Sequence, residues 1–270
     1  MKITVLSDNI GCGTLEGEWG LSFHIEFFGK KYLLDTGGSE LFLRNAEQLG
    51  IDVSDVDCAV LSHAHYDHSQ GLEAFFRVNG KADFFVSPNA AENCYAGLGF
   101  LGKYIGLPKG VLSAYKDRIK TPDGVAEIDK DVFVVPHSTP GLAKIGRKFH
   151  FYVRRGWRFV PDDFSHEQSL VFRTADGLVV LNSCSHTGPD IIMEEVERAF
   201  PGERVKAYLG GLHLFRTNEA GVRKVAAKLR ESGVSRIVTG HCTGDEAFEV
   251  LHSCLGDGIE QFHCGKVIEL

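Results

Sequence analysis

The chain has 270 residues and a formal net charge of -7 at pH 7, counting histidine as neutral. This length is ample for a buried core, and the negative charge disfavours nucleic acid as a general partner. The first residues lack a cleavage signal, and no apolar stretch approaches the ~18 residues that a membrane span needs. We therefore expect a cytoplasmic protein that does not bind membranes.

The chain contains no linker, repeat or break in composition, which predicts one domain over residues 1–270. Its seven cysteines form no C-x-x-C pair, and their odd number argues against a disulfide framework. A reducing compartment suits such a chain.

The N-terminal part alternates short β-like runs with turns. Glycine-containing turns join three such runs and predict hairpins, and a helical stretch then ends at Gly50. Residues 57–63 read as a buried strand that leads directly into a histidine cluster. The three runs are 2–7, 22–28 and 31–37, and the helical stretch is 39–50.

The second half of the chain passes from strands to alternating strands and helices. Strands are expected near 131–135, 148–153, 168–174, 178–182, 204–210 and 235–241, with helices at 189–200, 218–233 and 245–255. This order predicts an α/β fold with two mixed sheets packed face to face and helices outside. The strand ends would then gather the histidines.

The cluster itself reads LSHAHYDHSQGL, residues 61–72. In an extended segment, residues two apart point the same way, so His63 and His65 can face one cation while Asp67 and His68 face a second. Imidazole with carboxylate suits Zn²⁺, Fe²⁺ or Mn²⁺ better than Mg²⁺ or Ca²⁺. The alternatives are a loop of solvated histidines, or a closed structural zinc site, which would usually be rich in cysteine.

This H-x-H-x-D-H motif after a strand resembles the signature of the metallo-β-lactamase superfamily, whose fold is a four-layer αβ/βα sandwich. The resemblance covers nearly the whole chain. The segments LSDN, WGLSFHIEF, LLDTG, EQSLVF, NSCSHTG, GGLHL and GHCTG are similar to a branch that includes a dihydropterin synthase of methanopterin biosynthesis.

The resemblance implies two divalent transition-metal ions, with zinc as the first choice and manganese or iron as alternatives. It implies that His63 and His65 bind the first ion, and that Asp67, His68 and His241 bind the second. The sequence departs from the family pattern where a bridging aspartate is expected, because that position holds Cys184. A preceding histidine position holds Asp162.

Three assignments follow from this departure and stay open. His186 is the favoured replacement ligand of the first ion, and His166 is its competitor. Cys184 either binds metal as a thiolate or packs in the core at the end of an apolar strand.

Other residues are candidates for the surroundings of the metals. Asp35 either orients a ligand imidazole or caps a turn. His213 follows a glycine pair that would let the backbone approach a substrate, or it is an ordinary core histidine. Asp8 and Asn9 either line the rim of the site or form a plain turn.

Residues 144–158 hold six Lys or Arg and no acid, interleaved with aromatic residues. Arg154, Arg155 and Arg158 belong to this basic run. The run is either a flap that grips an anionic substrate or a solvated surface hairpin.

The sequence thus favours a metal-dependent hydrolase that uses a metal-activated water on an anionic small molecule. Asp67 would steady the water, while His213, His166, Arg154 and Arg155 would contact the substrate. The alternatives are a transferase of the dihydropterin synthase type that releases pyrophosphate, and a non-catalytic ligand sensor on the same scaffold.

Overall fold

The computed structural model describes residues 1–97, 102–137 and 139–270. The chain divides into two compact units. Unit 1 comprises Met1–Asp123, Ser138–Glu167 and His263–Leu270, and unit 2 comprises Gly124–His137 and Gln168–Phe262. That the two units form one domain stays a prediction.

Unit 1 contains a seven-stranded mixed sheet with the order β18-β1-β2-β3-β4-β5-β8. The strands from β18 to β3 pair antiparallel, and those from β3 to β8 pair parallel. The strands are β1 (Lys2–Ser7), β2 (Ser22–Phe27), β3 (Lys30–Leu34), β4 (Cys58–Val60), β5 (Asp83–Phe85), β8 (Ile119–Lys120) and β18 (Val267–Glu269).

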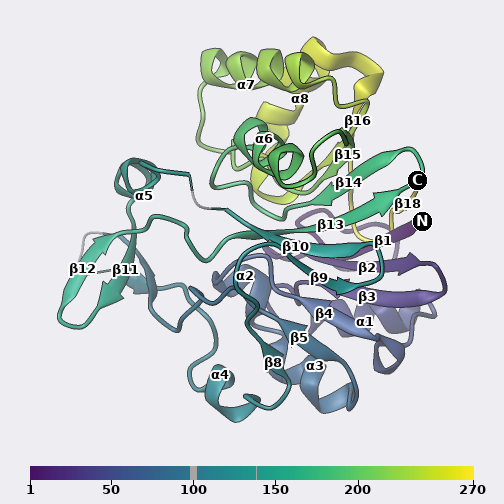
Figure 1. The fold of residues 1–270 in the computed structure, drawn as a ribbon, viewed down its shortest axis with the longest axis vertical. Coiled ribbons are helices and arrows are strands. Elements are labelled where there is room, and N and C mark those ends of the chain that lie inside the picture. The colour runs from purple at the N-terminus through teal and green to yellow at the C-terminus, as the bar shows by residue number, and fades with distance from the viewer. Residues whose placement is uncertain (98–101, 138) are drawn as a thin grey trace. The chain divides into compact units, whose positions relative to one another are not determined.

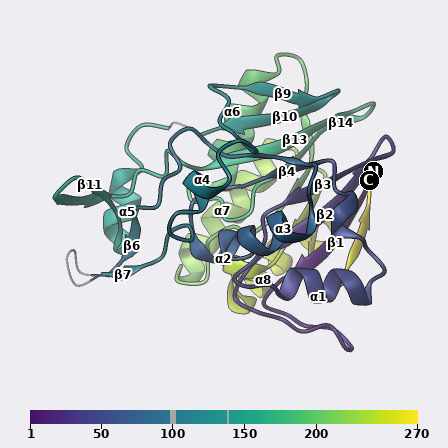
Figure 2. The ribbon, with the colours of Figure 1, turned by 90° about the horizontal axis from the view of Figure 1, so that it is seen from below.

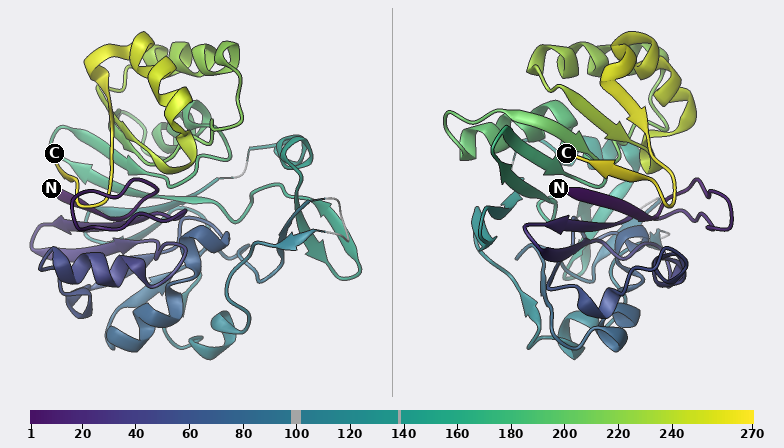
Figure 3. Two further views of the ribbon diagram at one scale, coloured as in Figure 1. Left: turned by 180° about the vertical axis from the view of Figure 1, so that it is seen from behind. Right: turned by 90° about the vertical axis from the view of Figure 1, so that its right-hand side faces the viewer.

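The predicted hairpins are confirmed only in part. β2 and β3 form a tight hairpin, because Phe28 and Gly29 both adopt positive φ angles, of 46° and 79°, as a two-residue turn requires. β1 also pairs with β2, but the connection is the long segment 8–21. The two chain ends meet beside β1, where the Met1 amino group donates to the Leu270 carbonyl at 2.8 Å (Figure 3).

Helices cover one face of this sheet (Figure 2). Phe42 and Ala46 of α1 and Phe75 of α3 pack with Leu33 and Ala59 of the sheet in one buried cluster. The helices of unit 1 are α1 (Leu41–Gln48), the 3-10 helix η1 (Val53–Asp55), α2 (Tyr66–Ser69), α3 (Leu72–Val78), α4 (Val111–Ala114) and α5 (Ala143–Phe149).

The basic run is a helix followed by a hairpin (Figure 1). Its first half forms α5, and its second half forms β11 (Phe151–Arg155) and β12 (Arg158–Pro161). The strand expected at 148–153 is therefore wrong in its first residues, because α5 continues to Phe149 and His150 closes the helix in the left-handed conformation. The hairpin joins β6 (Cys94–Ala96) and β7 (Lys103–Tyr104) in a small sheet.

Unit 2 contains the sheet β17-β16-β15-β14-β13-β10-β9, with helices packed against it. β14 to β17 are parallel, and β9 to β14 are antiparallel. The elements are β9 (Ala126–Asp129), β10 (Val132–Pro136), β13 (Gln168–Thr174), β14 (Gly177–Leu181), α6 (Pro189–Ala199), β15 (Val205–Leu209), α7 (Glu219–Ser232), β16 (Arg236–Thr239), η3 (His241–Thr243), α8 (Asp245–Leu255), η4 (Gly256–Gly258) and β17 (Ile259–Gln261).

The predicted α/β class, with mixed sheets and helices, is confirmed. The three helices expected in the second half of the chain match α6, α7 and α8 within two residues at each end. Among the helices that the structure describes, none is long and apolar enough to cross a membrane.

Buried His24 in β2 makes the stability of unit 1 sensitive to pH. Burial lowers the pKa of His24 from 6.5 to about 4; nearby Glu26 raises it by a smaller amount, and Lys31 and Lys2 lower it slightly further. Between pH 6.5 and 4 the unfolded chain therefore binds a proton that the folded chain does not, so stability falls as the pH falls. We expect the free energy of unfolding to lose roughly 1–3 kcal/mol over this window from this residue alone.

Urea unfolding at several pH values measures this contribution. The loss should be absent from the His24→Gln variant, and subtraction of the two profiles removes the effect of other titrating groups. Parallel profiles for both proteins would contradict the assignment.

Candidate functional site

The histidine cluster sits where β4 gives way to α2 in unit 1. His63 and His65 lie in extended backbone after the strand, whereas Asp67 and His68 lie in the first turn of α2. The imidazole ring centroids of His63 and His65 are 4.7 Å apart, and those of His63 and His68 are 4.2 Å apart. All four side chains are buried, so the motif is not a loop of solvated histidines.

Asp35 connects this cluster to the neighbouring strand. β3 and β4 are parallel neighbours, so Asp35 at the end of β3 lies beside Ser62, which follows β4. Asp35 is fully buried and accepts three hydrogen bonds: from the Ser62 amide at 2.7 Å, from the Ser62 hydroxyl at 2.6 Å and from Nδ1 of His68 at 2.7 Å. The expectation that Asp35 orients a cluster imidazole is confirmed.

These contacts determine which nitrogen of two histidines carries the proton. Because the single hydroxyl hydrogen of Ser62 goes to Asp35, the Ser62 Oγ must accept from Nδ1 of His63, 2.9 Å away. Nδ1 of His68 likewise donates directly to Asp35. Both histidines therefore keep the Nε2 lone pair for a ligand, as metal-binding histidines require.

Hydrogen bonds from Thr36 and Leu21 hold the backbone of Asp67 and His68 in place. Thr36 donates to the His68 carbonyl through its amide at 2.8 Å and through its hydroxyl at 3.1 Å. The Asp67 carbonyl accepts from the Leu21 amide, and its carboxylate Oδ2 lies 3.8 Å from Nε2 of His68. Two donor atoms at this separation can bind one cation between them.

A second buried group lies behind His65. Nδ1 of His166 accepts the Ala64 amide hydrogen at 3.2 Å, so the His166 proton is on Nε2, which faces the Asp162 carboxylate at 3.1 Å. Nε2 of His65 lies 3.8 Å from the same carboxylate, and the Cys94 thiol lies 3.8 Å from His166. Burial raises the pKa of the Cys94 thiol.

Both nitrogens of His166 thus have partners within the protein. Donor atoms of His65, Cys94, Asp162 and His166 also lie within 4.8 Å of one another, so His166 stays the competitor of His186 as a metal ligand. Nothing in the sequence signals the contact between His166 and Asp162, because this contact depends on a turn in which Asp162 accepts the Phe164 amide.

Unit 2 collects its donor residues at the ends of three adjacent parallel strands. Cys184 follows β14, His213 follows β15, and His241 with Cys242 follows β16. The carboxyl ends of parallel strands meet at one edge of a sheet, where such folds place their ligands. Ser185, His213 and His241 have positive φ angles, of 51°, 50° and 49°. Non-glycine residues in this conformation concentrate at functional sites.

The donor atoms of these loops lie close together. Two groups of three residues each have one donor atom per residue within 4.8 Å of the others. The first group is Cys184, His241 and Cys242, and the second is Cys184, His186 and His213. Burial alone would raise the pKa of the Cys242 thiol, but its hydrogen bonds with Cys184 and His213 and the nearby His241 lower the pKa well below its usual value. Sequence reasoning missed Cys242, although it directly follows His241.

The glycine pair before His213 serves the protein itself. A Cβ atom on Gly210 would lie 1.9 Å from the Asn182 carbonyl oxygen, and one on Gly211 would lie 2.5 Å from the Cys242 sulfur. The two glycines thus let the loop after β15 approach the loops after β14 and β16 closely, and their approach to a substrate stays a prediction.

The arginines of the basic run are exposed. Arg155 forms an ion pair with Asp163 at 3.1 Å, and Arg154 donates to the Gly156 carbonyl. The base of the same hairpin reaches the cluster, since the Phe151 ring lies 5.3 Å from the His65 ring. At ~3.3 Å per residue along β11, Arg155 lies roughly 13 Å from Phe151. Asp8 forms a turn, as its carboxylate accepts the Ile10 amide.

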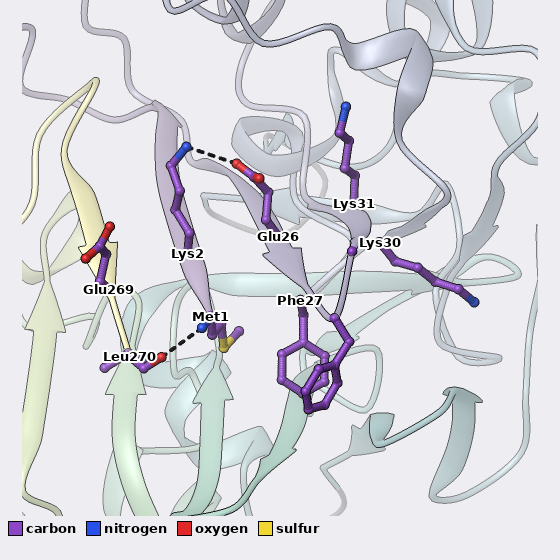
Figure 4. Close-up of a pocket in the computed structure, with 10 residues that line it drawn as sticks. Met1, Lys2, Glu26, Phe27, Lys30, Lys31, Glu269 and Leu270 are labelled. Atoms are coloured by element: carbon purple, nitrogen blue, oxygen red, sulfur yellow. Dashed lines mark hydrogen bonds and ion pairs between the residues drawn. The ribbon is translucent and has the colours of Figure 1, made fainter.

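An open pocket of about 560 Å³ lies elsewhere in unit 1, beside the chain ends (Figure 4). Lys2, Glu26, Phe27, Lys31 and Leu270 are among its lining residues. It is lined by none of the candidate metal ligands and is not the candidate site.

The donor chemistry fits a transition metal. Unit 1 offers buried imidazoles with unprotonated Nε2 atoms next to a carboxylate, and unit 2 offers buried imidazoles next to thiols. Nitrogen, oxygen and sulfur donors of this kind suit Zn²⁺ and its first-row neighbours, while Mg²⁺ and Ca²⁺ prefer oxygen alone.

The chain is similar to several known proteins. Residues 22–151 match the family model described as the Metallo-beta-lactamase superfamily. A solved structure, Tm1679, described as a metal-dependent hydrolase of the beta-lactamase superfamily, is 31% identical with a TM-score of 0.84, covering 100% of this chain and 99% of that one.

Two proteins of Methanocaldococcus jannaschii are also similar. One is named 7,8-dihydropterin-6-methyl-4-(beta-D-ribofuranosyl)-aminobenzene-5'-phosphate synthase, with 28% identity over 93% of this chain and 89% of that protein. The other, an uncharacterized protein named MJ0448, is 27% identical over 98% of this chain and 99% of that protein.

Replacing Asp35 tests its control of the imidazoles. Asp35→Asn puts an NH₂ group where a carboxylate accepts three hydrogen bonds, so the two histidines lose their fixed proton positions. We expect Zn²⁺ affinity to fall about 10- to 100-fold, as measured by competition with a chromophoric chelator. Asp8→Asn is the matched control, because Asp8 is equally buried and its carboxylate accepts the Ile10 amide. Equal affinity of the Asp35 variant and the control would refute the role.

The choice between His186 and His166 is tested by metal content. His186→Ala should lose about one ion per chain after reconstitution, because a ligand is removed. His166→Ala should keep its metal, because both ring nitrogens already bond within the protein. Elemental analysis decides, and the reverse pattern would exchange the two assignments.

Proposed function

Because the chain belongs to the metallo-β-lactamase superfamily, we propose that it is a metal-dependent hydrolase acting on an anionic small molecule. One observation supports this most strongly: Asp35 and Ser62 hold His63 and His68 with their Nε2 lone pairs ready for a ligand. A histidine kept only for packing has no need of such a fixed tautomer.

The proposed ligands are those that the family resemblance implies. His63, His65 and His186 would hold a first divalent ion, and Asp67, His68 and His241 would hold a second, with Cys184 as an additional donor. Zinc suits this mixture best, and manganese or iron are the alternatives. When bound, such ions act as Lewis acids and make hydroxide available from water near neutral pH.

The remaining steps belong to the chain's own side chains. The Asp67 carboxylate can accept a hydrogen bond from the attacking water and orient it. His213, which is partly exposed at the end of β15, can donate a proton or a hydrogen bond to an anionic substrate. Arg154 and Arg155 would add attraction for a negative group remote from the reacting bond.

A second candidate function is transfer rather than hydrolysis. The similarity to the dihydropterin-type synthase extends over 93% of this chain, well beyond the histidine motif. In that case the same residues would bind a pyrophosphate leaving group, and an arylamine would take the place of water.

A reconstituted-enzyme assay separates the two functions. Metal-loaded protein is incubated with phosphate esters, phosphodiesters, lactones and thioesters, and separately with a dihydropterin pyrophosphate in the presence and absence of an arylamine. Hydrolysis of any substrate of the first set supports the proposal. Pyrophosphate released only with the arylamine present would establish the transferase, and no turnover by protein carrying both ions would contradict both.

The basic run provides a separate prediction about specificity. Single replacement of Arg154, Arg155 or Arg158 with Ala should raise KM for an anionic substrate about 10-fold, since one charge-assisted contact is worth ~1.5 kcal/mol. The rate on a small neutral ester and the metal content should not change. Steady-state kinetics on both substrates checks this, with Lys130→Ala as a control outside the run. Equal losses on both substrates would indicate a structural role for the hairpin.

A further inference from the structure

Two thiols meet in unit 2 at the edge where β14 and β16 end. The Sγ atoms of Cys184 and Cys242 are 3.4 Å apart, and each residue is at most 3% exposed. They come from loops 58 residues apart in the sequence, so the fold brings them together. A nitrogen of His241 lies within 4.8 Å of both sulfur atoms.

These separations suit the first shell of a single cation. With Zn–S bonds of ~2.3 Å and Zn–N bonds of ~2.0 Å, tetrahedral geometry puts two sulfurs about 3.8 Å apart and a sulfur and a nitrogen about 3.5 Å apart. The observed sulfur pair needs to open by only about 0.4 Å to reach this distance.

The backbone at this edge of the sheet is strained. Simple packing of two cysteines would not require such strain. His241 has a positive φ of 49°, a strained conformation for a residue other than glycine. Gly211 carries no side chain where a Cβ atom would lie 2.5 Å from the Cys242 sulfur. The strain at His241 puts its imidazole beside the sulfurs, and the glycine makes room for one of them.

We propose that Cys184, Cys242 and His241 form a sulfur-rich cation position within unit 2, with Cys242 as a direct ligand. The inference rests on the proposed function, which already includes Cys184 and His241. It adds Cys242 as a ligand and specifies the class of ion. Two soft thiolate donors select thiophilic ions such as Zn²⁺, Cd²⁺ or Co²⁺ over Mn²⁺ and Mg²⁺. Binding deprotonates each thiol and releases its proton to solvent.

Cobalt substitution of the full chain tests the proposal, because thiolate bound to Co²⁺ gives a near-ultraviolet charge-transfer band that imidazole and carboxylate do not give. We expect the wild type to show this band. Cys242→Ser should reduce the band to about half per bound Co²⁺, as one of two thiolates is lost. Cys264→Ser is the matched control, because Cys264 is a fully buried thiol bonded to the Asp8 carbonyl, and it should leave the band unchanged.

Several outcomes would overturn the proposal. If Cys242→Ser keeps the full band at equal Co²⁺ content, Cys242 is not a ligand, and the proposed function is unaffected. If the wild type binds Co²⁺ without any charge-transfer band, no thiolate is bound and the sulfur-rich position is excluded. If the wild type binds no Co²⁺ at all, the proposed function itself fails.

A measurement on the wild type covers the case in which Cys242→Ser does not fold. Alkylation by iodoacetamide, followed by mass spectrometry of peptides, should be slower at Cys184 and Cys242 in Cd²⁺-loaded protein than in chelator-treated protein. The rate at Cys264 should be the same in both. Protection of Cys184 without protection of Cys242 would contradict the proposal.

Discussion

The Asp35 carboxylate is the constraint on which the site in unit 1 depends. It is fully buried, it sits in left-handed backbone with a φ of 61°, and it accepts hydrogen bonds from the Ser62 amide, the Ser62 hydroxyl and His68. A buried carboxylate is costly unless such donors surround it. Through Ser62 its influence extends to His63, so one side chain determines the proton positions of two imidazoles.

Parallel strands explain how each unit assembles its reactive groups. In unit 1, β3 and β4 end together and bring Asp35 to Ser62; in unit 2, β14, β15 and β16 end together and bring Cys184 near Cys242. Strained residues mark these strand ends in both units. Rigid strands thus hold the loops in place, and the loops contain the reactive side chains.

Local signals in the sequence predicted much of this arrangement. The H-x-H-x-D-H spacing, the strand before it and the helices of the second half depend on residues close in the chain, and they agree with the structure. Features that depend on distant residues were not predictable: Gly211 makes room for Cys242, and His166 bonds to Ala64 from 102 residues away. The basic run was expected to be a flap or a surface hairpin, and its charge did not reveal that α5 occupies its first half. Substrate identity has no local signature at all.

The control of His63 and His68 by Asp35 is tested most directly by nitrogen-15 NMR of the histidine side chains in chelator-treated protein. The chemical shifts distinguish a protonated ring nitrogen from an unprotonated one. Both histidines should carry their proton on Nδ1 near neutral pH, and Asp35→Asn should give mixed tautomers at both. A proton on Nε2 of either histidine in the wild type would contradict this control by Asp35.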